Sequence, residues 1–253
     1  MHLRVVLCAV AVLGSGTLLA QAPQAPPQTP LQTPRAAAPI DLTGTWVSVV
    51  TEEWRWRMVT APKGDFSSIP FNDDARKVGQ MWDPAADERS GNACRAYGAA
   101  GIMRMPGRMR FSWQDDNTLK METDAGQQTR LFRFGRPQLP SGDAGWQGSS
   151  QAEWKYATRA DRSAGPRPGA GTLSVTTTRM KPGYLMKNGA PYSGSAVLTE
   201  HFQRHNSPNG DNWFTVVVIL EDPTYLTERY VTSYHFKKEA DNSKWRPTPC
   251  AVG

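Results

Sequence analysis

Apolar and polar residues alternate along most of the chain from position 41 onward. In residues 108–114 the apolar side chains Met109, Phe111 and Trp113 share one face, and polar side chains occupy the other. A period of two is typical of a β-strand that buries one face. The pattern predicts strands at residues 41–50, 53–58, 108–114, 119–122, 129–134, 152–157, 172–180, 196–205, 213–220 and 229–236. About ten strands favour an all-β fold, either a closed antiparallel barrel or a sandwich.

Helix is expected at few positions. In residues 72–82, Asn72 is placed as an N-cap before Asp73 and Asp74, which are acids that favour the first turn of a helix. A second short turn has Pro84 at its first helical position. The sequence therefore predicts a barrel or sandwich with one short helix.

The first residues of the chain have the composition of an export signal. Residues 1–20 combine an early arginine with an apolar stretch that ends in Leu-Leu-Ala, as secretory signal peptides do. Residues 21–39 are rich in Pro, Gln and Ala and contain no aromatic residue, so we expect a disordered tether. Residues 40–253 are then expected to form a single β-barrel domain in a periplasmic or secreted protein.

The cysteines agree with that compartment. The sequence has three, and Cys8 lies within the signal peptide and is removed with it. Cys94 and Cys250 remain as an even pair where thiols are oxidised, so we predict one disulfide between them. Because this bond would close almost the whole of residues 40–253, it favours one domain over two.

Charge and hydropathy argue against two classes of partner. The formal net charge is +6, but the basic residues are scattered and form no long tract. A secreted chain with this distribution is not expected to bind nucleic acid. No internal apolar run reaches the roughly 18 residues of a spanning helix, so no integral membrane span is expected in the mature chain.

The start of the first strand carries a family motif. Leu42-Thr43-Gly44-Thr45-Trp46 resembles the Gly-x-Trp signature that opens lipocalin-like (calycin) barrels. This resemblance implies an antiparallel up-and-down barrel of about ten strands, with the tryptophan across its floor and a small lipophilic ligand at its mouth. Residues 198–204 and the later Glu221-Asp222-Pro223 also resemble a pattern in secreted bacterial proteins of uncharacterised function, which implies the same compartment and fold.

Tryptophan is abundant, at nine residues, and most of the indoles fall in predicted strands. Most aromatic side chains fill a core, and some of them can line an apolar cavity. The residues expected to bind a small hydrophobic molecule, with tyrosine and arginine as polar anchors, are Trp54, Trp56, Tyr97, Arg104, Trp113 and Tyr234. The small residues 98–101 leave space for a ligand or for another backbone.

An acid–base site is the alternative. His201 and His235 fall on predicted strands, and Glu221 and Asp222 lie at the end of another. An imidazole beside a carboxylate moves protons near neutral pH, so these four residues could serve a cofactor-free isomerase, hydratase or lyase. Their spacing matches no metal motif, and no metal or cofactor is expected.

Three functions therefore remain open from the sequence: a binding protein, an enzyme on the same barrel, and a structural component of the cell envelope with a plugged interior. The fold does not choose between them. The orientation of the histidines distinguishes catalysis from binding. Side chains that point inward beside a carboxylate favour catalysis, and side chains that point outward favour binding.

Overall fold

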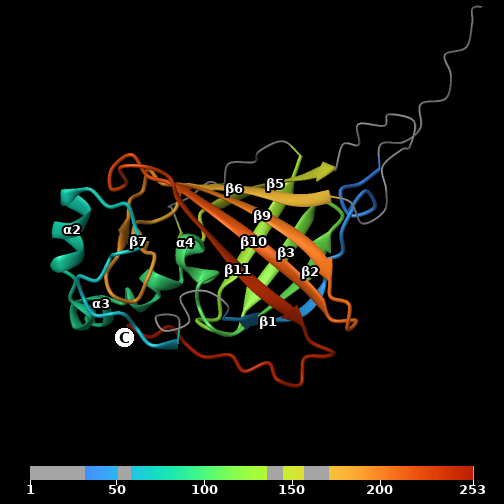
Figure 1. Cartoon of the computed structure of the whole chain (residues 1–253), viewed down its shortest axis with the longest axis horizontal. Coiled ribbons are helices and arrows are strands. Elements are labelled where there is room, and N and C mark those ends of the chain that lie inside the picture. The colour runs from blue at the N-terminus through green and yellow to red at the C-terminus, as the bar shows by residue number, and fades with distance from the viewer. Residues whose placement is uncertain (1–31, 51–57, 136–144, 157–170, 253) are drawn as a thin grey trace, which may run out of the picture. The chain divides into compact units, whose positions relative to one another are not determined.

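The computed structural model describes residues 32–50, 58–135, 145–156 and 171–252, and in this part of the chain nine strands close into one barrel (Figure 1). Their order around the ring is β1-β11-β10-β9-β6-β5-β4-β3-β2. The strands are β1 (Gly44–Val49), β2 (Arg108–Asp115), β3 (Thr118–Thr123), β4 (Thr129–Phe134), β5 (Ser149–Tyr156), β6 (Gly171–Thr178), β9 (Val197–Asn206), β10 (Asn212–Glu221) and β11 (Tyr230–Lys238). The all-β barrel is confirmed, and each expected strand has a counterpart except 53–58, which lies almost wholly outside the described residues.

The ring closes at its first strand. Strand β1 pairs with β2 on one side, where Trp46 faces Met109, and with β11 on the other, where Trp46 faces Lys238. The side chain of Trp46 is fully buried inside the ring, and its indole Nε1 donates a hydrogen bond of 2.7 Å to the carbonyl of Leu42. The Gly-x-Trp segment therefore anchors the start of the barrel.

One pair of strands departs from the antiparallel expectation. Strands β4 and β5 run parallel, with Phe132 opposite Ser150 and Phe134 opposite Ala152. Parallel neighbours need a crossover of about a dozen residues or more, which residues 135–148 provide, whereas a tight hairpin cannot connect them. The barrel is thus mixed, and every other pair in it is antiparallel.

Aromatic rings fill the middle of the barrel. Phe214 stacks on Phe236 with ring centroids 4.7 Å apart and meets the edge of Trp46 at 4.9 Å. Phe111 and Phe202, also buried, contact the same cluster at 5.8 and 6.0 Å. Aromatic pairs at such separations add roughly 0.5 to 1.5 kcal/mol each beyond the area that they bury.

A charged pair is buried beside these rings. Arg130 on β4 donates from Nη1 to Glu200 Oε1 at 2.9 Å and from Nη2 to Glu200 Oε2 at 2.5 Å, and both side chains are fully inaccessible to solvent. Nη2 also reaches Thr177 Oγ1 at 3.1 Å, and that hydroxyl lies 2.8 Å from Ser150 Oγ. Neither charge has access to water, so each depends on the other and on these hydroxyls.

Short helices cover one end of the barrel. They are α2 (Asp73–Gln80), α3 (Pro84–Arg89), the 3₁₀-helix η1 (Ala93–Tyr97) and α4 (Ala99–Ile102), with the two-residue strands β7 (Gly183–Tyr184) and β8 (Pro191–Tyr192) beside them. The expected cap is confirmed, because Asn72 Oδ1 accepts from the amide of Ala75 at 2.9 Å, and α3 begins at Pro84 as predicted. Neither η1 nor α4 was predicted from the sequence.

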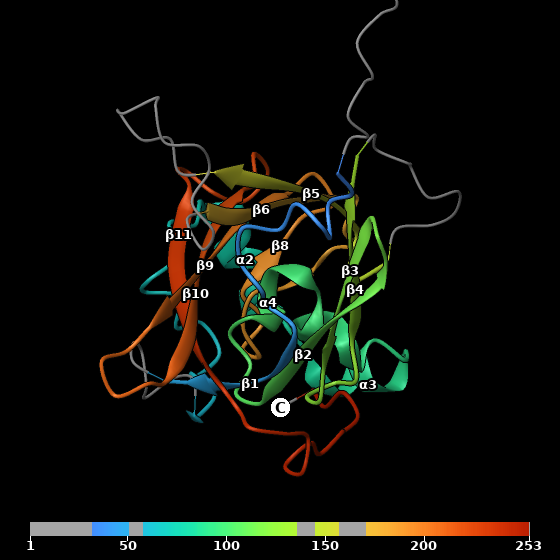
Figure 2. The same ribbon diagram turned by 90° about the vertical axis from the view of Figure 1, so that its right-hand side faces the viewer.

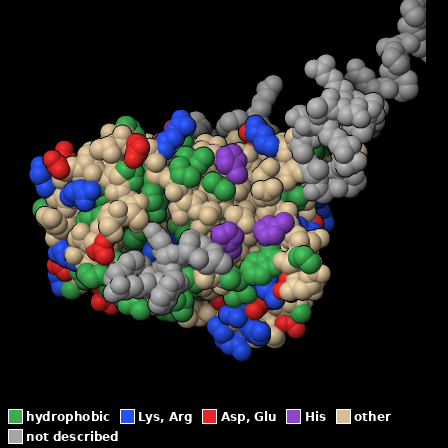
Figure 3. Space-filling model, viewed as in Figure 1, with side chains coloured by type: hydrophobic (Ala, Val, Ile, Leu, Met, Phe, Trp, Pro, Cys, Tyr) green, Lys and Arg blue, Asp and Glu red, His purple; other side chains and the backbone are tan. Residues whose placement is uncertain are grey.

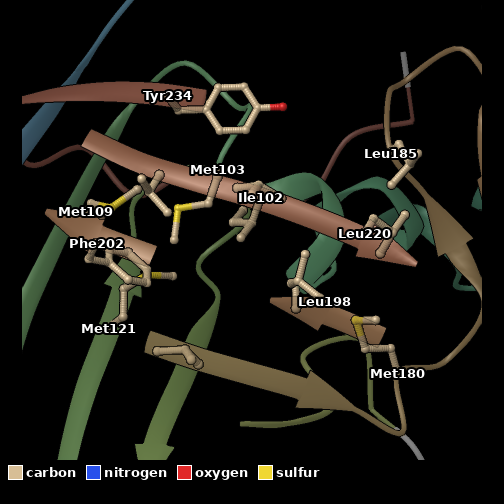
Figure 4. Close-up of a cluster of buried hydrophobic side chains, with 14 of the residues drawn as sticks. Ile102, Met103, Met109, Met121, Met180, Leu185, Leu198, Phe202, Leu220 and Tyr234 are labelled. Atoms are coloured by element: carbon tan, nitrogen blue, oxygen red, sulfur yellow. The ribbon is translucent and has the colours of Figure 1, made fainter. Parts of the chain in front are cut away.

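Helix α4 enters the barrel through this end. Its last residue, Ile102, and the following Met103 point between strand side chains such as Met109 and Leu198 (Figure 4). Close approach is allowed by a glycine, since a Cβ at Gly101 would lie 2.8 Å from the carbonyl oxygen of Tyr184. The small residues of this segment thus admit another backbone, one of the two alternatives expected.

The opposite end is crossed by the segment before β1, drawn in blue in Figure 2. The carbonyl of Pro34 accepts from Trp154 Nε1 at 2.8 Å, and the carbonyl of Ala37 accepts from Tyr156 Oη at 2.9 Å. Ile40 is buried in the core. Residues 32–39, the described part of the expected tether, are therefore held against the barrel by aromatic side chains. Among the described residues, no helix is long and apolar enough to cross a bilayer.

Candidate functional site

A pocket of about 370 Å³ lies at the helical end of the barrel. Small-molecule sites usually occupy about 300 to 1,000 Å³, so a compact ligand fits this space. The pocket is formed where η1, the turn after α4, the β3–β4 turn, the β7–β8 loop and the C-terminal segment meet. Its lining residues are Met58, Thr60, Ala61, Tyr97, Arg104, Met105, Pro106, Ala125, Met186, Lys187 and Thr248.

Tyr97, the last residue of η1, is fixed on several sides. Its hydroxyl accepts a hydrogen bond from the amide of Ala251 at 3.2 Å, and its carbonyl accepts from Gln147 Nε2 at 2.8 Å. Gly126 lies directly against the ring, because a Cβ at that position would be 2.3 Å from Tyr97 Cδ1. The φ of Gly126, +73°, is in the left-handed region that favours glycine. The ring therefore has little freedom to move away from the pocket.

The predicted disulfide is confirmed and braces the same wall. Cys94, three positions before Tyr97 in η1, is bonded to Cys250, and the two Cα atoms are 5.1 Å apart. The C-terminal segment is also held by the amide of Thr248, which donates to the carbonyl of Asp124 at 2.9 Å. A covalent bond and a backbone hydrogen bond thus position the part of the pocket that comes from the end of the chain.

Two cations border the pocket. Arg104, in the turn after α4, is only 6% exposed, and the amino group of Lys187 lies 5.2 Å from the centroid of the Tyr97 ring. A cation over an aromatic face is stabilised by the ring's negative charge density. Met105 and Met186 supply flexible, polarizable apolar surface beside these charges. The combination suits a ligand with an apolar body and an acidic group.

The sequence-predicted ligand residues divide among several places. Tyr97 and Arg104 meet at the helical-end pocket, as one site. Trp113 borders a different hollow at the opposite end, and Tyr234, which is 4% exposed, packs in the interior. Trp54 and Trp56 lie outside the described residues.

The structure does not bring the proposed acid–base residues together. His201 on β9 and His235 on β11 belong to the outer face of the sheet, and β10 separates their strands. Figure 3 shows histidine side chains on this outer surface. Their inward-facing strand neighbours, Phe202 and Phe236, are fully buried, which fixes the histidines on the other side of the pleat.

The two carboxylates have other roles. Glu221 forms an exposed ion pair with Arg229, whose Nε is 2.5 Å from Oε1. Asp222 is buried and accepts from the amide and the hydroxyl of Ser193, both at 2.7 Å, and from the amide of Thr224 at 3.0 Å. Asp222 therefore holds the turn after β10. Over the residues that the structure describes, no three His, Cys, Asp or Glu side chains are grouped closely enough to hold a metal ion.

Several pocket residues were not anticipated from the sequence. Lys187 and Met186 lie in the loop between β7 and β8, and Thr248 lies in the C-terminal segment. The segments around these residues show no hydrophobic periodicity and no motif that would identify them as part of a binding site. Only the disulfide, which places Cys250 beside η1, indicated that the end of the chain would reach this region.

Comparison of the chain with protein-family models, with curated proteins and with solved structures finds no match.

Proposed function

We propose that this chain is a lipocalin-like binding protein of the periplasm or the secreted fraction, and that it holds a small hydrophobic molecule with an acidic group. The observation on which this proposal rests is the pocket of about 370 Å³ in which Tyr97, Arg104 and Lys187 meet three methionines. An apolar body would contact the methionines, and an anionic group would be attracted by Arg104 and Lys187.

The placement of the histidines supports binding over catalysis. His201 and His235 lie on the outer face of the barrel, and the carboxylates of Glu221 and Asp222 are engaged with Arg229 and with a turn. A general base needs to lie within about 2.6 to 3.2 Å of the proton that it removes, beside a bound substrate. Among the described residues, the pocket of Tyr97 is lined by neither a histidine nor a carboxylate.

The export signal, the tether and the disulfide support the proposed compartment. A bond between Cys94 and Cys250 persists where thiols are oxidised, as in the periplasm or outside the cell. Purification of the exported protein and sequencing of its mature N-terminus test this part. Cleavage after Ala20 is expected, and a mature protein that retains residues 1–20 would contradict it.

Binding is tested with decanoate and decanol, which share an apolar chain and differ in charge. We expect decanoate to bind to the full-length mature protein at least about tenfold more tightly than decanol in isothermal titration calorimetry, because the cations favour the carboxylate. Lys187→Met should remove most of that preference while leaving the affinity for decanol similar.

Lys181→Met is the matched control. The Lys181 amino group also lies over an aromatic ring, 4.3 Å from the centroid of Trp146, but this lysine does not border the pocket. The control should bind decanoate like the wild type. Absence of binding for both molecules, or equal losses in the two lysine variants, would refute the proposed site.

A further inference from the structure

A second, larger hollow opens at the opposite end of the barrel, the end that faces the viewer in Figure 2. Its volume is about 790 Å³, and it lies where the segment before β1 meets the ends of β2 and β9. The lining residues are Arg35, Ala38, Pro39, Ile40, Asp41, Thr43, Trp113, Arg204, His205 and Asn206. Arg104 and Pro106 of the first pocket precede β2, whereas Trp113 lies near the end of that strand, so the two pockets are separated by the length of the barrel.

An aromatic ring on this second hollow is held in a fixed position. The Trp113 indole is packed against Phe134, with ring centroids 5.7 Å apart and planes inclined by 31°. Phe134 is supported in turn by Trp154 at 5.2 Å. Three rings in a row make a rigid support, and Trp113 is the one that borders the hollow.

Arg204 presents an ordered guanidinium at the same place. Nη2 donates to Asn212 Oδ1 at 2.6 Å and Nη1 donates to the carbonyl of Asp41 at 3.2 Å. Nε is buried and, within the described residues, has no hydrogen-bond partner. Because Nη1 and Nη2 are held by protein acceptors, the positive charge of Arg204 is fixed in position at the hollow.

The remaining polar groups supply both donors and acceptors. Asp41 Oδ1 accepts from the amide and the hydroxyl of Thr43, at 2.8 and 2.7 Å. Burial raises the pKa of Asp41, but these hydrogen bonds and the charges of Lys238 and Arg204 outweigh it and leave the pKa lowered. This carboxylate is therefore ionised at neutral pH and is an acceptor. Asn206 on the rim adds an amide.

This set of groups matches the chemistry of a sugar. A sugar ring has an apolar C–H face that packs on an aromatic ring, and neighbouring hydroxyls that donate to carboxylates and accept from guanidinium and amide groups. An apolar ligand would displace water from these charged groups without offering them hydrogen bonds, which costs free energy. Among the described residues that line the hollow, two arginines, Arg35 and Arg204, against one carboxylate favour a sugar that carries negative charge.

We propose that the hollow lined by Trp113 and Arg204 is a saccharide-binding site that prefers oligosaccharides containing uronic acids. Trp113 would support a sugar ring, and Arg204 and Arg35 would select for the carboxylate. This site is separate from the pocket of Tyr97 and would take a different class of ligand.

The test uses trigalacturonate and maltotriose with the full-length mature protein. We expect trigalacturonate to bind at least about tenfold more tightly than maltotriose in calorimetry, and to change the intrinsic tryptophan fluorescence. Trp113→Ala should weaken trigalacturonate binding at least about tenfold. Trp245→Ala is the matched control, because Trp245 stacks under Arg110 at 4.6 Å and does not border the hollow.

A second variant avoids any effect on the fold. The Arg35 side chain is 56% exposed, and its ion pair with Asp116 is long, at 3.9 Å. Arg35→Gln should weaken trigalacturonate binding about threefold and leave maltotriose binding unchanged. Arg229→Gln, at an arginine elsewhere on the surface that is 71% exposed, should change neither.

Four results would overturn the proposal: no saccharide binding at 10 mM, equal affinity for the two sugars, equal losses in the two tryptophan variants, or equal effects of the two arginine variants. Decanoate binding is measured on the same samples. Loss of saccharide binding with decanoate binding retained, or the reverse, shows which of the two sites fails.

Discussion

The buried pair of Arg130 and Glu200 offers a quantitative test of the barrel interior. Glu200→Gln keeps the size of the side chain and removes its charge, so the guanidinium of Arg130 stays in the interior without a counter-ion. Within the described structure, its other polar contact is the hydroxyl of Thr177, and its Cζ lies 5.0 Å from the centroid of the Phe132 ring. Neither of these neutral groups replaces a carboxylate.

The expected cost follows from the complete burial of both side chains. Removing one partner of a buried ion pair destabilises a protein by about 3 to 5 kcal/mol, because the remaining charge is uncompensated. A domain of this size loses roughly 2 to 4 °C in Tm for each kcal/mol, so we expect a decrease of about 6 to 20 °C. Replacing both residues, as in Arg130→Met with Glu200→Leu, should be less harmful than Glu200→Gln, since no charge is then left buried.

The assay is equilibrium unfolding in urea, followed by tryptophan fluorescence and by far-UV circular dichroism. Glu221→Gln is the matched control, because Glu221 pairs with Arg229 on the surface, where the two side chains are 46% and 71% exposed. Exposed pairs contribute about 0 to 1 kcal/mol, so this variant should unfold almost like the wild type. If Glu200→Gln lost less than about 1 kcal/mol, the interior would not be as inaccessible to water as the structure indicates.

Two further perturbations test the walls of the first pocket, and a third tests the burial of Tyr184 in β7. Replacing Cys94 and Cys250 by serine should lower the free energy of unfolding by about 4 to 5 kcal/mol, because the bond spans 156 residues and restricts the unfolded chain; unchanged urea unfolding would contradict this. Gly126→Ala should displace the ring of Tyr97 and weaken decanoate binding at least about tenfold. Its control is Gly210→Ala, at a φ of +84° but with open space around it, and equal effects on binding would exclude a clash as the cause. Burial raises the pKa of Tyr184 to about 12, while an unfolded tyrosine ionises near 10. The unfolded state therefore loses its proton first, and stability should fall as pH rises from 10 to 12, by less in Tyr184→Phe; identical pH profiles would refute this.

Most strands could be predicted because each buries one face. In β2, Met109 and Phe111 are buried, whereas the alternating residues Arg108, Arg110 and Ser112 are not. The period of two in the sequence therefore reflects the inside and outside of the barrel. The helix cap at Asn72 was equally readable, because its side chain bonds to an amide only three positions away. These features depend on local contacts.

Other features depend on contacts between distant segments and leave no local pattern. Nothing in residues 149–156 indicates that β5 runs parallel to β4, since a strand buries the same face in either direction. Helix α4, of four residues, is too short to show a helical period. The pocket likewise has no local pattern, because Tyr97 in η1, Lys187 in the β7–β8 loop and Thr248 in the C-terminal segment are brought together only by tertiary packing.

Closure of the ring through β1 has a consequence for biosynthesis. Trp46 pairs with Lys238, so the first strand of the barrel lacks its second neighbour until β11 has been synthesised. Proteins dominated by such distant pairings fold slowly, and an unpaired strand edge invites association with other chains. Newly synthesised molecules are therefore expected to depend on chaperones during the interval before the ring is complete.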